Sequence, residues 1–599
     1  MVKMAVQRIE QLRSVMKEES LAAFIVPSTD PHNGEYVPDR WKCREWITGF
    51  DGSAGTAVVT MTRAALWTDS RYFIAAQQQL EGTGIELMKL KVAGTPTIAE
   101  WLEEELTARD YKGSTEVGID GMCSSISTVE GLIEDLRSHG GLTLRTNLDP
   151  FERIWKDRPD YPMEPVKIYP VEYAGETTDS KLIRIRRQLR QSHADGMLVS
   201  ALDDIAWTLN LRGSDVECTP VFVSYLLISQ DRATLFVDSR KLSADVVAYL
   251  KGEGVTVDEY RNVSKGLKDY FEYNILIDPD EVAYTLLKKI ERIVVRGKSP
   301  IPSMKSVKNA TEQQGFRQAM LRDGIAMTKF LAWLKPAVEA GGQTEITVSE
   351  KLTSLRAEQA LFCGNSFATI SAYQEHGAIV HYEPTVETDV ELKPEGLLLL
   401  DSGGQYLDGT TDITRTIALG PLTDEQRKVY TLVLKGHIQL QMAVFPDGTR
   451  GTQLDVLARQ AMWREGYNYL HGTGHGVGAY LSVHEGPHQI RMENVDAPLH
   501  AGMTVTDEPG IYLEGKFGVR TENMLLVVED KQTDFGKFLK FETLTLCPID
   551  LEPVVSEMLT AEEKDWLKTY HQRVWETLSP HLDGNELEWL KRATRALED

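Results

Sequence analysis

The stretch LLLLDSGGQYLDGTTDITRT, residues 397–416, decides the fold of the C-terminal part of this chain. Its leucine run followed by Asp401 predicts a buried strand that ends in a charge, and a buried carboxylate needs a partner or a cation to stay ionised. Asp412 follows the turn-forming pair Asp408-Gly409, so a hairpin can bring the two acids to one site. Taken alone, the stretch is more often ordinary turn chemistry than a functional site.

Three more candidate ligands follow further along the chain. His475 lies among the glycines of LHGTGHGVG, which let the backbone approach a ligand, although a flexible loop with an incidental histidine has the same composition. Glu508 precedes Pro509 at the end of an apolar strand. Glu522 lies in GVRTEN, where strand alternation puts Arg520 on the same side. Each short stretch alone is more often a surface turn than a ligand.

The combination of these five residues carries the signal. Their order is Asp–Asp–His–Glu–Glu, with gaps of 11, 63, 33 and 14 residues. Four carboxylates and one imidazole are too many for one four-coordinate zinc ion and suit two divalent ions that share bridging carboxylates. Such a pair activates a water molecule and holds the oxygens of a hydrolytic transition state. The set predicts a metallohydrolase. A nucleotide loop is disfavoured, because neither GxxxxGK(S/T) nor GxGxxG occurs here.

Length and composition narrow the class further. A chain of 599 residues is too long for one hydrophobic core. Its net charge of −24 argues against nucleic acid as a partner. The 5 cysteines are scattered without CxxC spacing, as is typical of reduced thiols. With no signal-like apolar stretch at the N-terminus and no run of 18 apolar residues, we expect a cytoplasmic protein without a membrane partner.

A weak internal repeat organises the first half. Residues 6–30 have the pattern of a helix, a strand and a polar turn, and residues 181–204 repeat that order. Each copy then reaches a tryptophan, Trp46 or Trp207, followed by a Gly-Ser pair. Strand and helix patterns continue to alternate in both copies, which predicts two related α/β domains.

The pattern changes to α+β at about residue 306. Apolar residues three or four apart predict a helix that Pro336 stops. Thr423–Gln426 is a capping box for a second helix, expected to run to about Phe445. A further capping box at Thr560–Glu563 begins a tail helix, which we expect to dock on its own domain. Linkers rich in proline and charge then suggest three domains, at 1–158, 159–305 and 306–599.

Five further stretches reveal a family resemblance. They are AIVHYEP (378–384), HGTGHGVGAYLSVHEGP (471–487), TDEPGIYLEGKFGVRTEN (506–523), EWITGFDGSAGTAVV (45–59) and LWTDSRYF (66–73). Together with residues 397–416 they closely resemble aminopeptidase P, the X-prolyl aminopeptidase, in its long, three-domain cytosolic form. The resemblance implies two creatinase-N-like α/β domains followed by a C-terminal pita-bread catalytic domain, the fold of prolidase, creatinase and methionine aminopeptidase. The middle domain matches in length and pattern more than in motif.

The resemblance also assigns expected roles. Asp401 resembles a ligand of one metal, His475 and Glu508 resemble ligands of the other, and Asp412 and Glu522 resemble bridging carboxylates. Three histidines resemble the catalytic and substrate-binding set, with proton-transfer or oxyanion roles: His381, His471 and His484.

Residues around this set have expected supporting roles. We expect Arg520 to brace Glu522, and Asp401 or a metal to anchor the substrate's α-amine. His376 and His488 have no matched role and are expected at the surface or behind the ligands.

The implied activity is removal of an N-terminal residue when proline is second, through a hydroxide activated by two metal ions. The bond before proline is a tertiary amide that general peptidase sites accept poorly. Manganese suits the oxygen-rich ligands, with cobalt or zinc possible in vitro. The family implies peptide substrates with proline second and a homodimer.

Three alternatives stay open at this stage. Prolidase cuts only Xaa-Pro dipeptides with the same ligands, and the two extra N-terminal domains argue against it. A metal-free pita-bread domain that binds histones or peptides is disfavoured because all five ligands are retained. A creatinase-like amidinohydrolase does not need this metal set.

Overall fold

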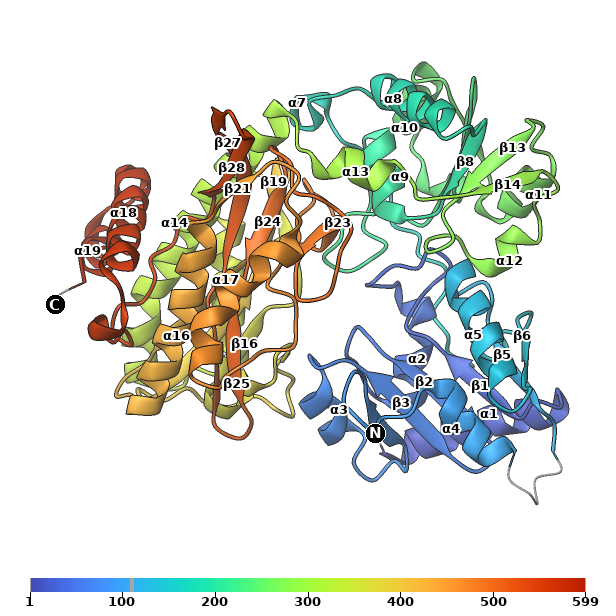
Figure 1. Ribbon diagram of the computed structural model, residues 1–599, viewed down its shortest axis with the longest axis horizontal. Helices are drawn as coiled ribbons and strands as arrows, with labels where there is room; N and C mark the ends of the chain where they lie inside the picture. Colours follow the sequence, from blue (N-terminus) through green and yellow to red (C-terminus); the bar gives the residue numbers. More distant parts are fainter. Residues whose placement is uncertain (1, 108–112, 598–599) are drawn as a thin grey trace. The chain divides into compact units, whose positions relative to one another are not determined.

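The computed structural model describes residues 2–107 and 113–597, and the chain forms two compact units (Figure 1). The first comprises residues 1–169 and 176–301, and the second comprises residues 170–175 and 302–599. The finer division at 158 and 305 stays a prediction. None of the helices in the described ranges is long and apolar enough to cross a membrane.

The first unit contains two six-stranded sheets. One has the order β4-β3-β2-β1-β5-β6, with β1 (Ala23–Val26), β2 (Thr56–Thr60), β3 (Ala64–Thr68), β4 (Glu86–Lys89), β5 (Glu116–Ile119) and β6 (Thr143–Arg145). The other has the order β12-β11-β10-β8-β13-β14, with β8 (Gly196–Val199), β10 (Tyr225–Ser229), β11 (Ala233–Phe236), β12 (Val255–Asp258), β13 (Asn274–Ile277) and β14 (Ile293–Arg296). Short strands β7 (Lys167–Ile168) and β9 (Leu211–Arg212) form a separate pair.

These two sheets confirm the internal repeat. The central strand β1 pairs antiparallel with β2 and parallel with β5, and β8 pairs in the same senses with β10 and β13. Helices α1 (Val2–Glu18) and α8 (Thr178–Gln191) precede the two central strands. The two tryptophans lie in α2 (Cys43–Thr48) and α9 (Leu202–Leu209), and both helices end at a left-handed residue.

The remaining helices of the first unit connect the strands. They are α3 (Phe73–Gln79), α4 (Ile98–Leu106), α5 (Ile126–Ser138), α6 (Phe151–Ile154), α10 (Ala244–Gly252), α11 (Val263–Lys268) and α12 (Tyr284–Leu287).

The second unit is built from several small sheets and long helices. Its sheets are β15-β18-β19, β16-β17-β20, β21-β28-β27-β24 and the pairs β22-β23 and β25-β26. The strands are β15 (Phe362–Asn365), β16 (Ile370–Tyr373), β17 (Leu397–Ser402), β18 (Gly404–Tyr406), β19 (Gly409–Thr410), β20 (Ile413–Ala418), β21 (Val444–Pro446), β22 (Gly474–Gly476), β23 (Glu485–Ile490), β24 (Thr504–Asp507), β25 (Gly510–Leu513), β26 (Phe517–Arg520), β27 (Asn523–Thr533) and β28 (Gly536–Thr543). The helices are α7 (Val171–Ala174), α13 (Ile301–Ser306), α14 (Ala310–Ala340), α15 (Glu345–Ala357), α16 (Asp424–Gln441), α17 (Gly451–Arg464), α18 (Ala561–Leu578) and α19 (Gly584–Ala593).

The prediction that Pro336 stops its helix is wrong. Helix α14 begins at a capping box of Asn309 and Glu312 and continues past Pro336 to Ala340. A proline inside a helix loses the bond from its own nitrogen to the preceding turn and its ring crowds the carbonyl there, a cost that packing can offset. Burial of Leu334 and Val338 on the core side holds the last turn in place, and the helix stops at Gly341, which has a φ of 82°.

The two other capping boxes are confirmed. Thr423 and Gln426 cap α16, which ends at Gln441 rather than near Phe445 because β21 begins at Val444. Thr560 and Glu563 cap the tail helix α18. Its apolar face joins the core cluster that contains residues of α16, as expected for a docked tail.

We expect Pro336→Ala to raise the melting temperature of the unit that contains it. The residue is exposed, so the change restores a helical hydrogen bond without altering the core, and an interior proline costs about 3 kcal/mol relative to alanine. Differential scanning calorimetry measures the effect, with the exposed non-helical Pro394→Ala as the control. An unchanged or lower transition for Pro336→Ala would contradict this account.

Candidate metal centre

Two neighbouring strands bring the first two acids together. Strands β17 and β20 pair antiparallel, with Asp401 opposite Thr414, so Asp412 lies just before the paired segment. Both carboxylates are buried, with 7% and 4% of their residues exposed. The antiparallel pair β18 and β19 forms the predicted hairpin between Asp401 and Asp412.

Thr414 fixes the position of the last acid. Its carbonyl oxygen accepts the N–H of Glu522 at 3.0 Å. Its hydroxyl donates to Oε2 of the same side chain at 2.8 Å. Buried Arg415 adds a second hold, because Nη1 donates to the carbonyl oxygen of Glu522 at 2.6 Å and Nη2 donates to the Tyr570 hydroxyl of α18 at 3.0 Å. Glu522 is thus oriented by the neighbouring strand and, indirectly, by the tail helix.

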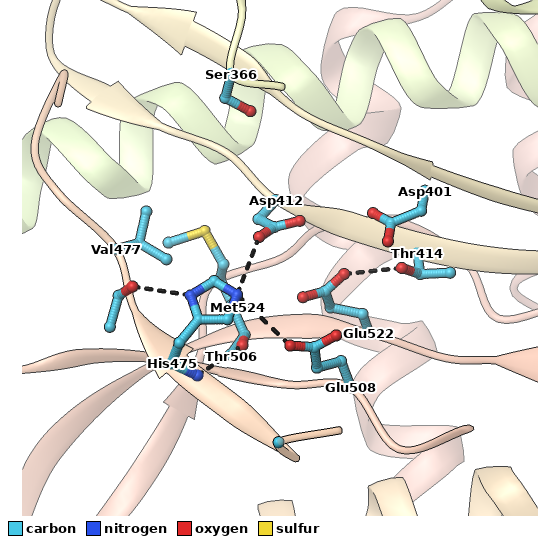
Figure 2. A network of polar contacts seen from close by, with 12 residues as sticks. Ser366, Asp401, Asp412, Thr414, His475, Val477, Thr506, Glu508, Glu522 and Met524 are labelled. Carbon is cyan, nitrogen blue, oxygen red and sulfur yellow. Dashed lines mark hydrogen bonds and ion pairs between the residues drawn. The ribbon is translucent and has the colours of Figure 1, made fainter. Parts of the chain in front are cut away.

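His475 lies on β22 and faces the acids (Figure 2). Its ring Nδ1 lies 2.9 Å from the Gly476 carbonyl oxygen, to which it donates as the N–H tautomer. Nε2 then carries the lone pair, and it lies 3.5 Å from both Asp412 Oδ2 and Glu508 Oε1. A carbonyl that fixes the tautomer from behind is the usual support of a metal-binding histidine.

The ligand atoms of Asp412, His475 and Glu522 lie within 4.8 Å of one another. Burial, followed by the charges of Glu522 and Asp401, raises the pKa of Asp412 well above its ordinary value. Burial and the charge of Asp401 raise the pKa of Glu522 to about 8. Oδ1 of Asp401 is buried and has no hydrogen-bond partner among the described residues. Divalent cations would supply the missing positive charge, so the residues present fit a site for two metal ions.

Arg520 binds Asp401 directly and reaches Glu522 only through the Thr414 hydroxyl, which lies 3.3 Å from Arg520 Nε and donates to Glu522. Its Nε and Nη2 donate to Asp401 Oδ2 at 3.1 and 2.6 Å, and its Nη1 donates to the Tyr512 hydroxyl at 2.8 Å. Strand β26 ends at Arg520 and β27 begins at Asn523, so the alternation that would align Arg520 with Glu522 is interrupted between them.

The three candidate catalytic histidines occupy different positions. The His484 ring lies edge-on to that of His475, with ring centroids 4.4 Å apart. His471 donates from Nδ1 to the Gly472 carbonyl oxygen at 2.7 Å, and its Nε2 lies 2.8 Å from the Tyr512 hydroxyl, which donates to it. His381 follows Val380, whose carbonyl oxygen accepts from Arg520 Nη1 at 3.3 Å.

The two histidines without a matched role are both bound. His376 Nδ1 contacts Glu345 Oε1 at 2.9 Å. His488 is fully buried, not at the surface, and contacts the Thr504 carbonyl oxygen at 2.7 Å. Burial lowers its pKa to about 4, so it is neutral.

Sequence reasoning missed Tyr512 and Thr414. Tyr512 lies between Arg520 and His471: its hydroxyl accepts from Arg520 Nη1 and donates to His471 Nε2, each at 2.8 Å. Burial raises its pKa to about 12, so the hydroxyl keeps its proton. Neither residue stands out in its own stretch, because a tyrosine or threonine in a strand is ordinary. Only the three-dimensional pairing identifies them.

Comparison with known families agrees with this architecture. Residues 314–529 match metallopeptidase family M24, and residues 537–597 match the C-terminal region of peptidase M24. Residues 8–145 and 157–312 each match the creatinase/prolidase N-terminal domain. The expected fold class, two creatinase-N-like domains before a pita-bread domain, is confirmed, and the fold and cluster are those of a metallopeptidase.

Full-length relatives define the family more narrowly. The chain is 39% identical to aminopeptidase P1 of Arabidopsis thaliana, covering 98% of each chain, and 40% identical to a probable Xaa-Pro aminopeptidase P of Paracoccidioides brasiliensis (strain Pb03), covering 99% of each. The solved X-prolyl aminopeptidase of Caenorhabditis elegans, described as a cytosolic enzyme with a di-nuclear active site, is 35% identical, with a TM-score of 0.94 over 99% of both chains. This chain belongs to the aminopeptidase P family.

We expect Asp412→Asn and Glu522→Gln each to lose most of the bound divalent metal. Each change removes a negative charge from the centre of the buried cluster while keeping the size of the side chain. Metal content of the purified chain, measured by emission spectrometry, checks this. Asp424→Asn, an exposed change at the start of α16, is the control and is expected to keep its metal. Wild-type metal content in either test variant would rule out the assigned ligands.

Proposed function

We propose that this protein is a metal-dependent aminopeptidase that hydrolyses the bond between an N-terminal residue and a following proline. The observation that carries the proposal is the cluster of Asp412, His475 and Glu522, within 4.8 Å of one another, in a chain similar over its whole length to X-prolyl aminopeptidases. The cluster supports hydrolysis, and the full-length similarity supports the substrate class.

Five residues are proposed to hold two divalent ions: Asp401, Asp412, His475, Glu508 and Glu522. Asp412 and Glu522, the most buried acids and the closest to the centre, are the proposed bridges. When bound, the ions supply Lewis acidity toward the scissile carbonyl and make water a stronger nucleophile. The oxygen-rich donor set favours manganese, with cobalt or zinc as substitutes in vitro.

The remaining polar residues are proposed to orient the substrate. His484, whose ring lies edge-on to that of His475, is proposed to stabilise with an N–H the charge that develops on the scissile carbonyl oxygen. His381 is proposed to act in proton transfer or in holding the substrate. His471 is proposed to act with Tyr512, because its Nε2 already accepts the tyrosine hydroxyl. Arg520 holds one oxygen of Asp401, which leaves the other available to a cation or to the substrate's α-amine.

Proline specificity has a physical basis in the substrate. The amide before proline has no N–H, so a site built for it needs no acceptor at that position. The pyrrolidine ring also offers apolar surface that alanine lacks. A substrate with alanine second brings a buried N–H without a partner and loses the ring contacts.

Two further properties belong to the proposal. We place the protein in the cytosol, as its C. elegans relative is described, and we propose a homodimer from the family resemblance.

Prolidase activity is the alternative, and it is disfavoured because aminopeptidase relatives match 98–99% of this chain. Cleavage of Arg-Pro-Pro as well as of Gly-Pro distinguishes an aminopeptidase from a dipeptidase.

We expect at least about 10²-fold discrimination in kcat/KM between matched peptides with proline or alanine in the second position. The unpaired N–H costs about 1–3 kcal/mol and the lost ring contacts cost a similar amount, while each ~1.4 kcal/mol is tenfold. Chromatographic detection of the released residue measures both rates. Equal rates would indicate a broad aminopeptidase and would contradict the proposed specificity, even with the metal site intact.

We expect His484→Ala and His381→Ala to keep their metal and to lose at least about 10²-fold in kcat, the range of an acid–base or oxyanion group. Asp412→Asn and Glu522→Gln should be more completely inactive, because each removes a shared ligand. Metal analysis and steady-state kinetics on one Xaa-Pro peptide compare the four variants. Loss of metal from either histidine variant would make that histidine a ligand and the five-residue set wrong.

A further inference from the structure

A buried ion pair lies on α17, outside the candidate metal centre. Asp455 and Arg459 are one helical turn apart, and Arg459 Nε donates to Asp455 Oδ2 at 2.6 Å. Their side chains are only 3% and 1% exposed. Burying two charges is expensive, and such pairs contribute little net stability compared with apolar residues of similar size. The other contacts of the pair therefore indicate what it does.

Arg459 holds the backbone that carries His471. Its Nη1 donates to the Tyr469 carbonyl oxygen at 2.6 Å, and its Nη2 donates to the His471 carbonyl oxygen at 3.0 Å. The guanidinium also lies over the Tyr469 ring, 3.7 Å from its centroid. The planar fork of one arginine thus fixes two carbonyl groups of the same loop, which a lysine could not do in this geometry.

Asp455 holds the other end of this loop. Its Oδ1 accepts the Thr473 hydroxyl at 2.5 Å, and that hydroxyl accepts in turn from the Tyr469 hydroxyl at 2.5 Å. The Thr473 carbonyl oxygen then accepts the N–H of Glu508 at 2.7 Å. The ion pair therefore holds residues 469–473 by hydrogen bonds at both ends of the loop. This loop comes just before His475 in the chain, and its last residue binds the backbone of Glu508.

We propose that the Asp455–Arg459 pair is the positioning device of the His471 loop. The pair fixes the position and orientation of His471 relative to the candidate metal centre. Because His471 accepts a hydrogen bond from the Tyr512 hydroxyl, the pair also fixes that hydroxyl. Both residues act through His471 and do not touch the substrate. This inference rests on the proposed function, since the position of His471 matters only if the centre hydrolyses peptides.

The test is a double-mutant cycle on the metal-loaded full chain with an Arg-Pro-Pro peptide. Arg459→Met should lower kcat about 10- to 100-fold, the effect of a misplacement of about 1 Å, with KM and bound metal unchanged. In a His471→Ala background the same change should cost less than about 3-fold, because the group that Arg459 positions is absent. Arg464→Met, at an exposed position of the same helix, is the matched control and should leave kcat unchanged.

A second background separates positioning from general loosening. His484 lies beside Glu485, which a different buried ion pair with Lys308 anchors. In a His484→Ala background, Arg459→Met should therefore lower kcat by the same factor, about 10- to 100-fold, as in the wild-type chain. Equal, additive losses in both backgrounds, or an unchanged kcat in Arg459→Met, would overturn the positioning role.

Two safeguards keep the outcomes distinct. If Arg459→Met does not fold, Arg459→Lys takes its place with the same expectations, because it keeps a positive charge beside Asp455 but cannot reach both carbonyls. A wild-type chain that leaves Xaa-Pro peptides intact overturns the proposed function and this inference together. An active wild-type chain with additive losses overturns this inference alone.

Discussion

Mutual repulsion among buried carboxylates is the constraint around which the catalytic unit is built. Asp401, Asp412 and Glu522 are each less than a tenth exposed, and their charges act on one another. Without cations, Glu522 takes up a proton more readily in the folded chain than in the unfolded one, because its pKa is raised to about 8. A raised acid pKa means that folding stability falls as pH rises between the ordinary value of 4.5 and about 8. Cations that occupy the cluster offset this cost, so folding of the site and metal binding are linked.

Neighbouring polar groups hold the side chains of this cluster in place. Arg520 holds Asp401, Thr414 and Arg415 hold Glu522, and the Gly476 carbonyl oxygen orients His475. These supports all come from strands and not from free loops, which fixes each side chain closely. Where a loop is used, at residues 469–473, the helix α17 grips it at both ends. Rigid support of this kind is what a site needs to hold reacting groups within about 0.5 Å.

Much of the fold and of the candidate site could be predicted from short sequence patterns. The capping boxes at Thr423 and Thr560 were readable because each depends on residues only three positions apart. The repeat was readable because both copies keep the same order of elements. Residue types and spacing, together with the family resemblance, indicated the acids and histidines of the candidate site, and the structure groups Asp412, His475 and Glu522. Their roles stay proposals.

What the sequence could not predict depends on tertiary contacts. Pro336 has the propensity of a helix stop, but packing of Val338 overrides it. Arg520 pairs with Asp401 because the strand is interrupted after it, and no pattern along the chain shows that interruption. Asp455 and Arg459 look like an ordinary helical pair at one-turn spacing, and only their burial against residues 469–473 distinguishes them. Residues that support a site from behind have no sequence signature of their own.

The hold of Arg415 on both Glu522 and Tyr570 has a consequence for how the catalytic part can be isolated. Tyr570 lies in α18, beyond residues 314–529 that match metallopeptidase family M24 and within the separate C-terminal match at residues 537–597. A fragment cut at that boundary would strip Arg415 of its tyrosine partner and of the Pro548 and Cys547 carbonyl oxygens it also binds. A buried guanidinium left without those acceptors costs several kcal/mol. We therefore expect a fragment of this unit that folds on its own to include the tail. Helix α18 in the tail supports Glu522 through Tyr570 and Arg415.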